Sequence, residues 1–342
     1  MSFDIIDPVQ YPGWDKLLLT HPDSSFFHTS SWAQVLRTYD YKPLYFVSIH
    51  NYRLENLVPM MEVSSPLTGK RGVSLPFTDF CHPILAPGEA TRGFIANVLK
   101  WGQGVKWKSI DFRSDGYKFG NVAPRATYRV HTVALKAAEH ELLRSFRSST
   151  RRNIQKARKT GVNAHCSRSL RALKEFYRLH VINRKVHGLP PQPFDFFYAI
   201  FDQILRKKLG TVVLATHDNR AVAGAVIFYF GREAIYKFGA SDRKYLQLRP
   251  NNLVFWEAMR HCIRRGIKRY SLGRTVPQNK GLLQFKRGWT RDESSLGYYR
   301  YDLRRRRFVS KGSMVKEGYR IFQWMPVSML KLCGKLLYRH IA

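Results

Sequence analysis

The stretch "TVVLATHDNRAVAGAVIFYF", residues 211–230, decides the fold. Two runs rich in β-branched and aromatic residues flank a polar turn at residues 218–220, which is typical of a β-hairpin. The same pattern occurs in the first half of the chain, where "KPLYFVSIH" and "LENLVPMMEV" flank the turn "NYR" at residues 51–53. Helical segments precede each hairpin, and a helix and a strand follow it. We therefore predict two similar halves built from α/β layers.

The boundary between the halves falls where "HTVALKAAEH", residues 131–140, restarts the order of elements. We expect domains at residues 1–132 and 133–312, followed by a helical tail at 313–342. In the first half, helices are expected at 31–39 and 89–100 and a strand at 107–113. In the second half, helices are expected at 169–186, 194–208 and 251–266, and strands at 234–240 and 267–272.

The tail combines basic and apolar faces. Lys331, Lys335 and Arg339 recur every four residues and share one helical face. Apolar side chains lie toward another face: Leu332, Cys333, Leu336, Leu337 and Ile341. Two interpretations remain open: a helix resting on an anionic membrane, or a terminal helix closing the domain core.

Composition indicates an anionic partner. The 342 residues include 58 Lys and Arg against 24 Asp and Glu, a net charge of +34. This excess favours nucleic acid, an anionic membrane surface or phosphorylated substrates; the alternative is a highly charged surface that keeps the protein soluble. The four cysteines form no CxxC or Cys/His ligand pair, so we expect no zinc site. We expect no other metal and no cofactor. The amino terminus has no signal-peptide core, and the longest apolar run, residues 221–230, is too short to span a bilayer, so we expect a cytoplasmic protein.

One predicted helix has an unfavourable start. In "FRSSTRRNIQKARKTG", residues 146–161, Ser149 is the expected N-cap and Gly161 the residue after the end. Arg151 and Arg152 fall in the first turn, where the helix dipole disfavours cations. Together with the hydroxyl groups of residues 148–150, they predict an anion-binding site at this helix start.

Several common catalytic motifs are absent from the sequence. It contains no G-x-S-x-G, no GxxxxGK[ST] and no HExxH, and no acidic pair marks a glycosidase. His187, in "VHGLPPQP", is the most interesting histidine, although a lone histidine is more often structural.

Seven segments occur in this order: "HPDSSFFHTSSWAQVL", "SLPFTDFCHP", "RRNIQKARKTGV", "HGLPPQPFDFF", "YKFGASD", "YSLGRT" and "GLLQFKRGW". Together they resemble the FemABX-like branch of the GNAT acyltransferase superfamily. The resemblance extends from about His21 to Tyr301. It implies two tandem GNAT-like domains with mixed, largely antiparallel sheets flanked by helices. It also implies an enzyme that moves an amino acid from aminoacyl-tRNA to an amine of a cell-wall precursor.

The resemblance also implies site residues. Lys286, in "FKRGW", matches the Lys of the family's "FK" motif and would stabilise an oxyanion or grip a tRNA phosphate; the alternative is an ordinary solvated Lys. Arg274, in "LGRT", follows a strand, so it is either a second catalytic candidate or part of a structural salt bridge. Where the cell-wall branch grips acceptor phosphates, this chain has Leu36, with Arg37 beside it, and Gln192.

The expected donor loop departs from the usual GNAT pattern. The segment "SDRKYLQLRPN", which contains Asp242, stands where GNAT enzymes bind the coenzyme A pyrophosphate, and it lacks their glycines. This weakens the case for coenzyme A and leaves room for another donor. The candidate substrate-binding residues are therefore Arg37, Arg151, Arg152, His187, Gln192 and Asp242.

Three functions follow from these observations. The first is an acyl- or aminoacyl-transferase that forms an amide on a cell-envelope precursor, with aminoacyl-tRNA as one possible donor. The second is an N-acyltransferase of exopolysaccharide or lipid assembly that uses a coenzyme A or carrier thioester. The third is a non-catalytic RNA- or membrane-binding protein on a degenerate transferase fold.

Overall fold

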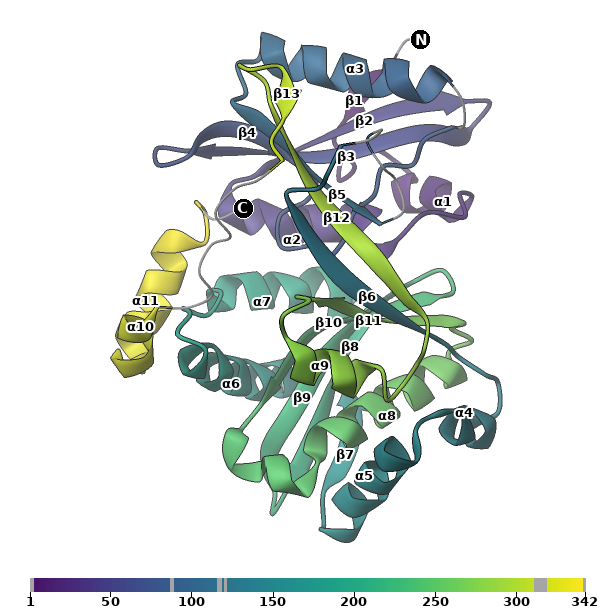
Figure 1. Ribbon diagram of the computed structural model, residues 1–342, viewed down its shortest axis with the longest axis vertical. Coiled ribbons are helices and arrows are strands. Elements are labelled where there is room, and N and C mark those ends of the chain that lie inside the picture. Colours follow the sequence, from purple (N-terminus) through teal and green to yellow (C-terminus); the bar gives the residue numbers. More distant parts are fainter. Residues whose placement is uncertain (1–2, 87–88, 116–118, 120–121, 311–318, 341–342) are drawn as a thin grey trace. The chain divides into compact units, whose positions relative to one another are not determined.

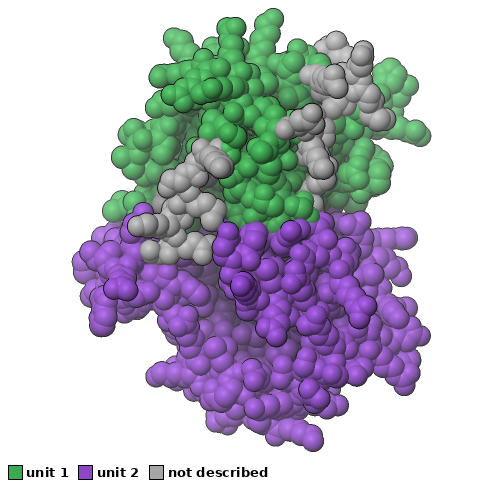
Figure 2. Space-filling view, in the orientation of Figure 1, with its two compact units in different colours: residues 1–128, 295–314, 336–342 green, residues 129–294, 315–335 purple. Residues whose placement is uncertain are grey.

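The chain divides into two compact units in a computed structural model that describes residues 3–86, 89–115, 119, 122–310 and 319–340 (Figure 1). Unit 1 comprises residues 1–128, 295–314 and 336–342, and unit 2 comprises residues 129–294 and 315–335 (Figure 2). Each unit has its own set of paired strands and its own core, so each is described by itself.

Unit 1 is built on the sheet order β1-β2-β3-β4-β5-β12, with β13 added beside β12. Strand β4 runs antiparallel to β3 and parallel to β5. The strands are β1 (Asp4–Ile6), β2 (Lys42–His50), β3 (Arg53–Ser65), β4 (Gly69–Val73), β5 (Ser109–Asp115), β12 (Glu293–Asp302) and β13 (Arg307–Phe308); the helices are α1 (Trp14–Leu19), η1 (Phe26–His28), α2 (Ser30–Leu36), η2 (Arg37–Tyr39) and α3 (Glu89–Gly104).

Unit 2 is built on the order β7-β8-β9-β10-β11-β6. Strand β10 is antiparallel to β9 and parallel to β11. The strands are β6 (Ala126–Ala134), β7 (Asn163–Ser167), β8 (Gly210–His217), β9 (Arg220–Phe230), β10 (Glu233–Ser241) and β11 (Arg269–Thr275). The helices are α4 (Glu139–Ser145), α5 (Ser148–Lys159), α6 (Leu170–Val186), α7 (Phe194–Ile200), the π-helix η3 (Phe201–Leu205), the 3-10 helix η4 (Arg243–Leu248), α8 (Pro250–Arg264), α9 (Lys280–Lys286), α10 (Arg320–Trp324) and α11 (Val327–Leu337).

The two units share one plan, which confirms the predicted α/β fold class. Three antiparallel strands lead into a helix and then into a strand parallel to the third: β2, β3, β4, α3 and β5 in one unit, β8, β9, β10, α8 and β11 in the other. The predicted hairpins are β2–β3 and β8–β9. Strand β4 was not predicted, because "GKRGV" is short and carries two glycines and two cations.

The units are not contiguous in sequence, unlike the expected domains at 1–132 and 133–312. Strand β12 follows α9 in the sequence, yet from Leu296 to Asp302 it pairs with β5 and extends the sheet of unit 1. Strand β6 follows β5 in the sequence, yet from residue 129 onward it pairs with β11 in unit 2. Unit 1 thus takes β12 from beyond its main segment, whereas the paired part of β6 opens the main segment of unit 2.

Apolar side chains on both faces of each sheet form the cores, since neighbouring strand residues such as Tyr45 and Phe46, or Ile227 and Phe228, are all buried. In unit 1, Phe46, Phe94 and Trp107 belong to one buried cluster between the sheet and α3. In unit 2, Ile227, Trp256 and Tyr270 belong to a buried cluster between the sheet and α8. Burial of such side chains contributes roughly 1.5–3 kcal/mol each, so the two cores hold the backbone that carries the site.

Two details differ from the sequence predictions. Helix α5 begins at Ser148 with Arg147 as its N-cap, so the expected N-cap Ser149 is wrong; the backbone N–H of Arg147 is tied to Gly288 O at 3.1 Å. The tail folds as two short helices, α10 and α11, because Pro326 follows an extended Met325. Residues 313–318 and 341–342 of the predicted tail, including Ile341, lie outside the described residues.

Candidate active site

Strands β10 and β11 separate part of the way along unit 2. Their parallel pairing covers Glu233 to Ile235 opposite Arg269 to Ser271, and no further pair joins them within the described residues. Strand β10 continues beside β9 to Ser241, and β11 continues beside β6 to Thr275. Backbone groups that have no partner strand are available to an extended ligand. The fork between these strands is therefore the candidate active site.

A bulge shapes the β11 side of this fork. The register with β6 jumps between Ser271 and Arg274, so two residues of β11 face one residue of β6. Gly273 lies in that bulge with a φ of 71°, a conformation that favours glycine. The carbonyl oxygens of Gly273 and Arg274 are both turned toward α9, where they accept hydrogen bonds.

The hydrogen-bond donor to these two carbonyls is Lys286, in the last turn of α9. Its Nζ donates to Gly273 O at 2.7 Å and to Arg274 O at 3.2 Å. The residue is only 3% exposed, so the alternative of an ordinary solvated Lys is wrong. A buried ammonium group thus reaches the carbonyls at the fork, including the backbone carbonyl of Arg274. The predicted catalytic roles of Lys286 and Arg274 stay predictions.

An ionisable cluster that sequence reasoning missed adjoins Lys286. The fully buried His131 lies on β6 with its Nε2 3.0 Å from Glu293 Oε2. Burial lowers the pKa of His131; Glu293 opposes this shift, and the charge of Lys286 adds to it. Arg287 Nε donates to Glu293 Oε2 at 2.8 Å, and this bond lowers the pKa of the Glu293 carboxyl. The lowered pKa favours the neutral imidazole of His131. A lone histidine in a strand gave no sequence signal.

Two hydroxyl groups at the fork also escaped prediction. Thr275 ends β11, is 2% exposed, and its Oγ1 has no hydrogen-bond partner among the described residues. On β10, the Tyr236 hydroxyl lies over Gly239 so closely that a Cβ at Gly239 would meet it at 1.4 Å. Only glycine leaves room for this ring. Threonine and tyrosine are too common in strands for the sequence to mark these two.

Gln192 is a buried residue of the loop between α6 and α7. Its Oε1 lies 2.8 Å from Nε2 of the buried His180, and its backbone oxygen accepts the Tyr177 hydroxyl at 3.0 Å. His187 is the exposed C-cap of α6. Burial lowers the pKa of His180 to about 3. Gln192 is therefore held by hydrogen bonds within unit 2. The predicted roles of Gln192 and His187 toward substrate stay predictions.

The expected donor segment folds as the 3-10 helix η4. Asp242 is its N-cap, and its carboxylate accepts the Lys244 N–H at 3.1 Å. Arg249 then takes a left-handed conformation and precedes Pro250 at the first position of α8. A carboxylate occupies the start of this turn, where the GNAT pattern would place glycine N–H groups for a pyrophosphate.

The start of α5 is anchored beside α9. Thr150 is buried and donates to Gly288 O at 3.1 Å, so it is not available to the predicted anion site. Arg151 Nη1 donates to Arg144 O at 3.0 Å, and Arg152 is exposed. Two cations therefore lie in the first turn, as expected, and their anion-binding role stays a prediction.

Arg37, in unit 1, forms an ion pair with Asp7 and donates to Gln34 Oε1 at 3.2 Å. This ion pair partly neutralises the charge of Arg37, which was the candidate to replace the Lys that grips acceptor phosphates in the cell-wall branch.

Unit 1 also contains a basic hollow that the sequence did not predict. It has a volume of about 490 Å³ and is lined by cations from the start of β4, the loop after α3 and the turn after β12. The stem of Lys108 crosses Gly69, where a Cβ would meet its Cε at 2.4 Å. Lys70 pairs with Glu62 at 3.0 Å. The other four cations have no ion pair among the described residues: Lys106, Lys108, Arg304 and Arg306.

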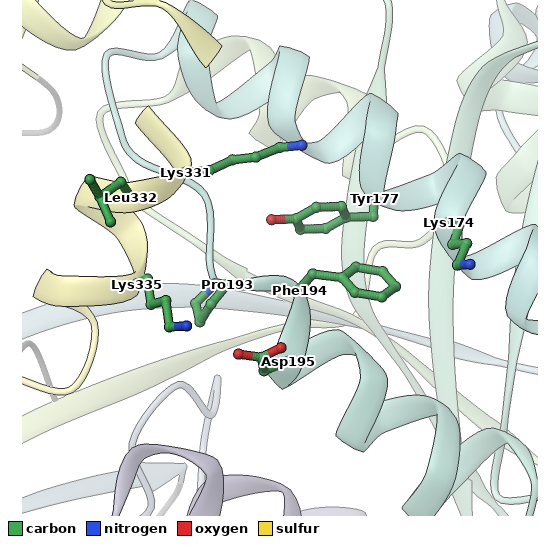
Figure 3. A pocket seen from close by; sticks show the side chains of 8 residues that line it. All are labelled: Lys174, Tyr177, Pro193, Phe194, Asp195, Lys331, Leu332 and Lys335. Carbon is green, nitrogen blue, oxygen red and sulfur yellow. The ribbon is translucent and has the colours of Figure 1, made fainter. Parts of the chain in front are cut away.

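A second hollow, of about 550 Å³, lies in unit 2 between α11 and the α6–α7 region (Figure 3). Within the described ranges, no helix is long and apolar enough to cross a membrane. In the same part of the chain, no three His, Cys, Asp or Glu residues gather as metal ligands would.

Comparisons with known proteins show what this chain is similar to in sequence and in fold. Residues 144–287 match the acetyltransferase (GNAT) domain family. A segment of 93 residues is 33% identical to a lipid II:glycine glycyltransferase of Staphylococcus haemolyticus (strain JCSC1435); it covers 25% of this chain and 22% of that relative, so less than a quarter of the relative's length is matched.

Solved structures share the fold. The crystal structure of FemX superposes with a TM-score of 0.67 at 14% identity, over 86% of this chain and 96% of FemX. A tandem GNAT protein from the clavulanic acid biosynthesis pathway gives a TM-score of 0.55 at 10% identity, over 88% and 98% of the two chains. At such identities the likeness extends to the fold alone.

Proposed function

We propose that this chain, a FemABX-like protein of the GNAT superfamily, joins an acyl or aminoacyl group to an amine of a cell-envelope precursor. The observation that carries the proposal is the fork between β10 and β11, with the buried Lys286 ammonium held at the carbonyls of Gly273 and Arg274. The relative of Staphylococcus haemolyticus is named as a glycyltransferase acting on lipid II, which supports the choice of acceptor class.

The reaction requires little of the protein. The neutral amine of the acceptor attacks the carbonyl carbon of the donor ester, a C–N bond forms, and the C–O bond to the donor breaks. One amine proton ends on the leaving oxygen. A positive charge near the tetrahedral intermediate stabilises its oxyanion, and an extended substrate held along open strand edges supplies proximity. We assign the charge to Lys286, with Arg274 beside it.

The proposed donor is aminoacyl-tRNA. Two observations support it: the basic hollow of unit 1 offers four cations to phosphates, and the Asp242 carboxylate occupies the turn at the usual pyrophosphate position. A coenzyme A or carrier thioester for exopolysaccharide or lipid assembly, and a non-catalytic binding protein, are the alternatives. The proposed acceptor would place the enzyme in the cytoplasm, peripherally at the inner face of the cell membrane.

A binding experiment separates the donors. The nuclease-treated protein is titrated with charged tRNA and, separately, with acetyl-coenzyme A. We expect tRNA binding that weakens with salt and little affinity for coenzyme A. Tight coenzyme A binding with turnover would establish the thioester alternative, and RNA binding without any transfer would establish the non-catalytic one.

A charge-matched pair of variants tests the basic hollow. In one, Lys106, Lys108, Arg304 and Arg306 are changed to Gln; in the control, the exposed Lys16, Lys42, Arg53 and Lys100 of the same unit are changed to Gln. We expect the log–log salt slope of tRNA binding to fall, in the first variant only, by about 0.9 for each duplex phosphate that is no longer neutralised. Equal slopes in both would remove the hollow from the donor site.

A further inference from the structure

The tail helices α10 and α11 dock on unit 2 through a narrow inner face. Leu330 is fully buried, and Gly334 lies so close to the loop after α6 that a Cβ there would be 2.0 Å from Pro191 O. Tyr319 N donates to Gly188 O at 2.8 Å, and Gln323 Nε2 donates to Val186 O at 3.2 Å. The tail therefore has a fixed position on unit 2.

The outer face of the same helices is apolar and exposed. Trp324 is 85% exposed and Leu332 is 58% exposed. The remaining large apolar side chains exposed on α10 and α11 are Ile321, Val327, Met329 and Leu336. Of the two interpretations of the tail, closure of the core does not hold for Leu332 and Leu336, because both side chains are exposed.

Cations surround this apolar face. Arg320, Lys331 and Lys335 are exposed on the two helices, and residues 319–340 contain no Asp or Glu. An apolar helix face that includes an exposed Trp and is bordered by Lys and Arg matches the interface of an anionic bilayer, where the ring lies at headgroup level and the cations meet lipid phosphates.

The hollow beneath α11 adds a place for a headgroup. Lys331 and Lys335 extend from α11 toward Tyr177, Pro193 and Asp195, which line the opposite wall (Figure 3). Lys331 Nζ lies 5.7 Å from the centroid of the Tyr177 ring. The hollow thus combines ammonium groups with aromatic walls and a single carboxylate, Asp195, and its lining includes the exposed Leu332 of the apolar face.

We propose that this hollow binds the phosphate headgroup of an anionic glycerophospholipid while the outer face of α10 and α11 enters the same leaflet. Lys331 and Lys335 bind the phosphate, the rings of Tyr177 and Phe194 contact the glycerol region, and Trp324 and Leu332 lie among the upper acyl carbons. We choose an anionic lipid surface over a protein partner because lipid phosphates are negative and the side chains that border the apolar face are positive. The inference is independent of the proposed reaction.

The test uses the full chain and vesicles of phosphatidylcholine with and without phosphatidylglycerol. Among the seven tryptophans, all described, Trp324 is the exposed one, so its emission reports on the tail. We expect a blue shift and quenching by brominated acyl chains with phosphatidylglycerol present, both lost in Trp324→Phe. Lys331→Gln with Lys335→Gln should weaken binding roughly fivefold per charge removed.

Matched controls separate this site from general charge and hydrophobicity. Lys207→Gln with Lys268→Gln removes two exposed lysines of unit 2, and Leu19→Ala with Leu67→Ala removes two exposed leucines of unit 1. Both should bind vesicles like the parent chain, whereas Trp324→Ala with Leu332→Ala should not. If both lysine double variants lose vesicle binding equally, the binding depends on net charge and not on this hollow. A different result would assign the apolar face to a second copy of the chain. In that case the parent chain self-associates but does not bind vesicles, and Trp324→Ala with Leu332→Ala abolishes the self-association.

Discussion

The ammonium of Lys286 donates a 2.7 Å hydrogen bond to the carbonyl oxygen of Gly273, across 13 residues of sequence. This bond ties the end of α9 to the bulge in β11 and places a buried positive charge at the fork. It also makes Lys286 part of the folded structure, so its replacement is expected to affect stability as well as turnover.

The first prediction concerns that stability. Lys286→Met keeps the apolar stem but leaves the carbonyls of Gly273 and Arg274 without this donor, which should cost about 1–3 kcal/mol of unfolding free energy. Lys280→Met, at the exposed start of the same helix, is the control and should stay within about 0.5 kcal/mol. Denaturant unfolding measures both, and equal values for the two variants would contradict the hydrogen bonds.

The second prediction concerns pH. Burial lowers the pKa of His180 to about 3 from an ordinary value of 6.5. The unfolded state therefore takes up a proton first, and stability should fall as the pH drops below 6.5, by about 1.4 kcal/mol per unit for this group. His180→Phe keeps a ring among Phe176 and Phe197 and removes this contribution. Unfolding free energies at pH 7 and pH 5 should therefore differ less in the variant than in the parent; an unchanged difference would mean that His180 is not held neutral.

The third prediction concerns the start of α5. Arg151→Gln with Arg152→Gln should weaken RNA binding and lower the salt slope by about 0.7 for each single-strand phosphate that the variant no longer binds. Arg158→Gln with Lys159→Gln, at the favourable end of the same helix, removes the same charge and serves as control. Identical slopes for the two variants would make Arg151 and Arg152 ordinary surface charges.

The fourth prediction concerns the docking of the tail. Gly334→Ala places a Cβ against Pro191 O, so α11 must shift, and we expect a loss of about 1–3 kcal/mol and faster proteolysis after Met325. Gly93→Ala, in α3, meets nothing within 4 Å and should be neutral or stabilising. A stable, protease-resistant Gly334→Ala chain would mean that the tail is not held there.

The sequence predicted the elements whose signal is local. The hairpins β2–β3 and β8–β9 were found because their apolar runs flank polar turns. Strand β4 and the placement of β12 in unit 1 were missed, because a short glycine-rich strand has little pattern and strand partners are chosen by tertiary pairing. The same limit applies to the site.

At the site, the resemblance selected Lys286, and the position after a strand selected Arg274. The Lys286 ammonium contacts the backbone carbonyl of Arg274, while the catalytic roles of both residues stay predictions. The resemblance could not show that Lys286 is buried. A Lys residue can pack its apolar stem in a core when its ammonium group has carbonyl partners, and the local sequence does not record those partners. His131 and Thr275 matter through their enclosure, which no local pattern records. Ser149 was a reasonable cap by residue type, but the hydrogen bond between Arg147 and Gly288 sets where α5 begins.

The most direct test of the central claim is single-turnover transfer from saturating labelled aminoacyl-tRNA to an amine-bearing cell-envelope precursor, which separates chemistry from donor binding. We predict amide formation by the parent chain, a rate roughly 10²–10³-fold lower in folded Lys286→Met, and partial recovery in Lys286→Arg because its charge has a different geometry. The Lys280→Met control should transfer at the parent rate. A parent-like single-turnover rate in Lys286→Met would contradict the assignment of the oxyanion charge to Lys286, and no transfer by the parent chain from any acyl donor would contradict the proposed function itself.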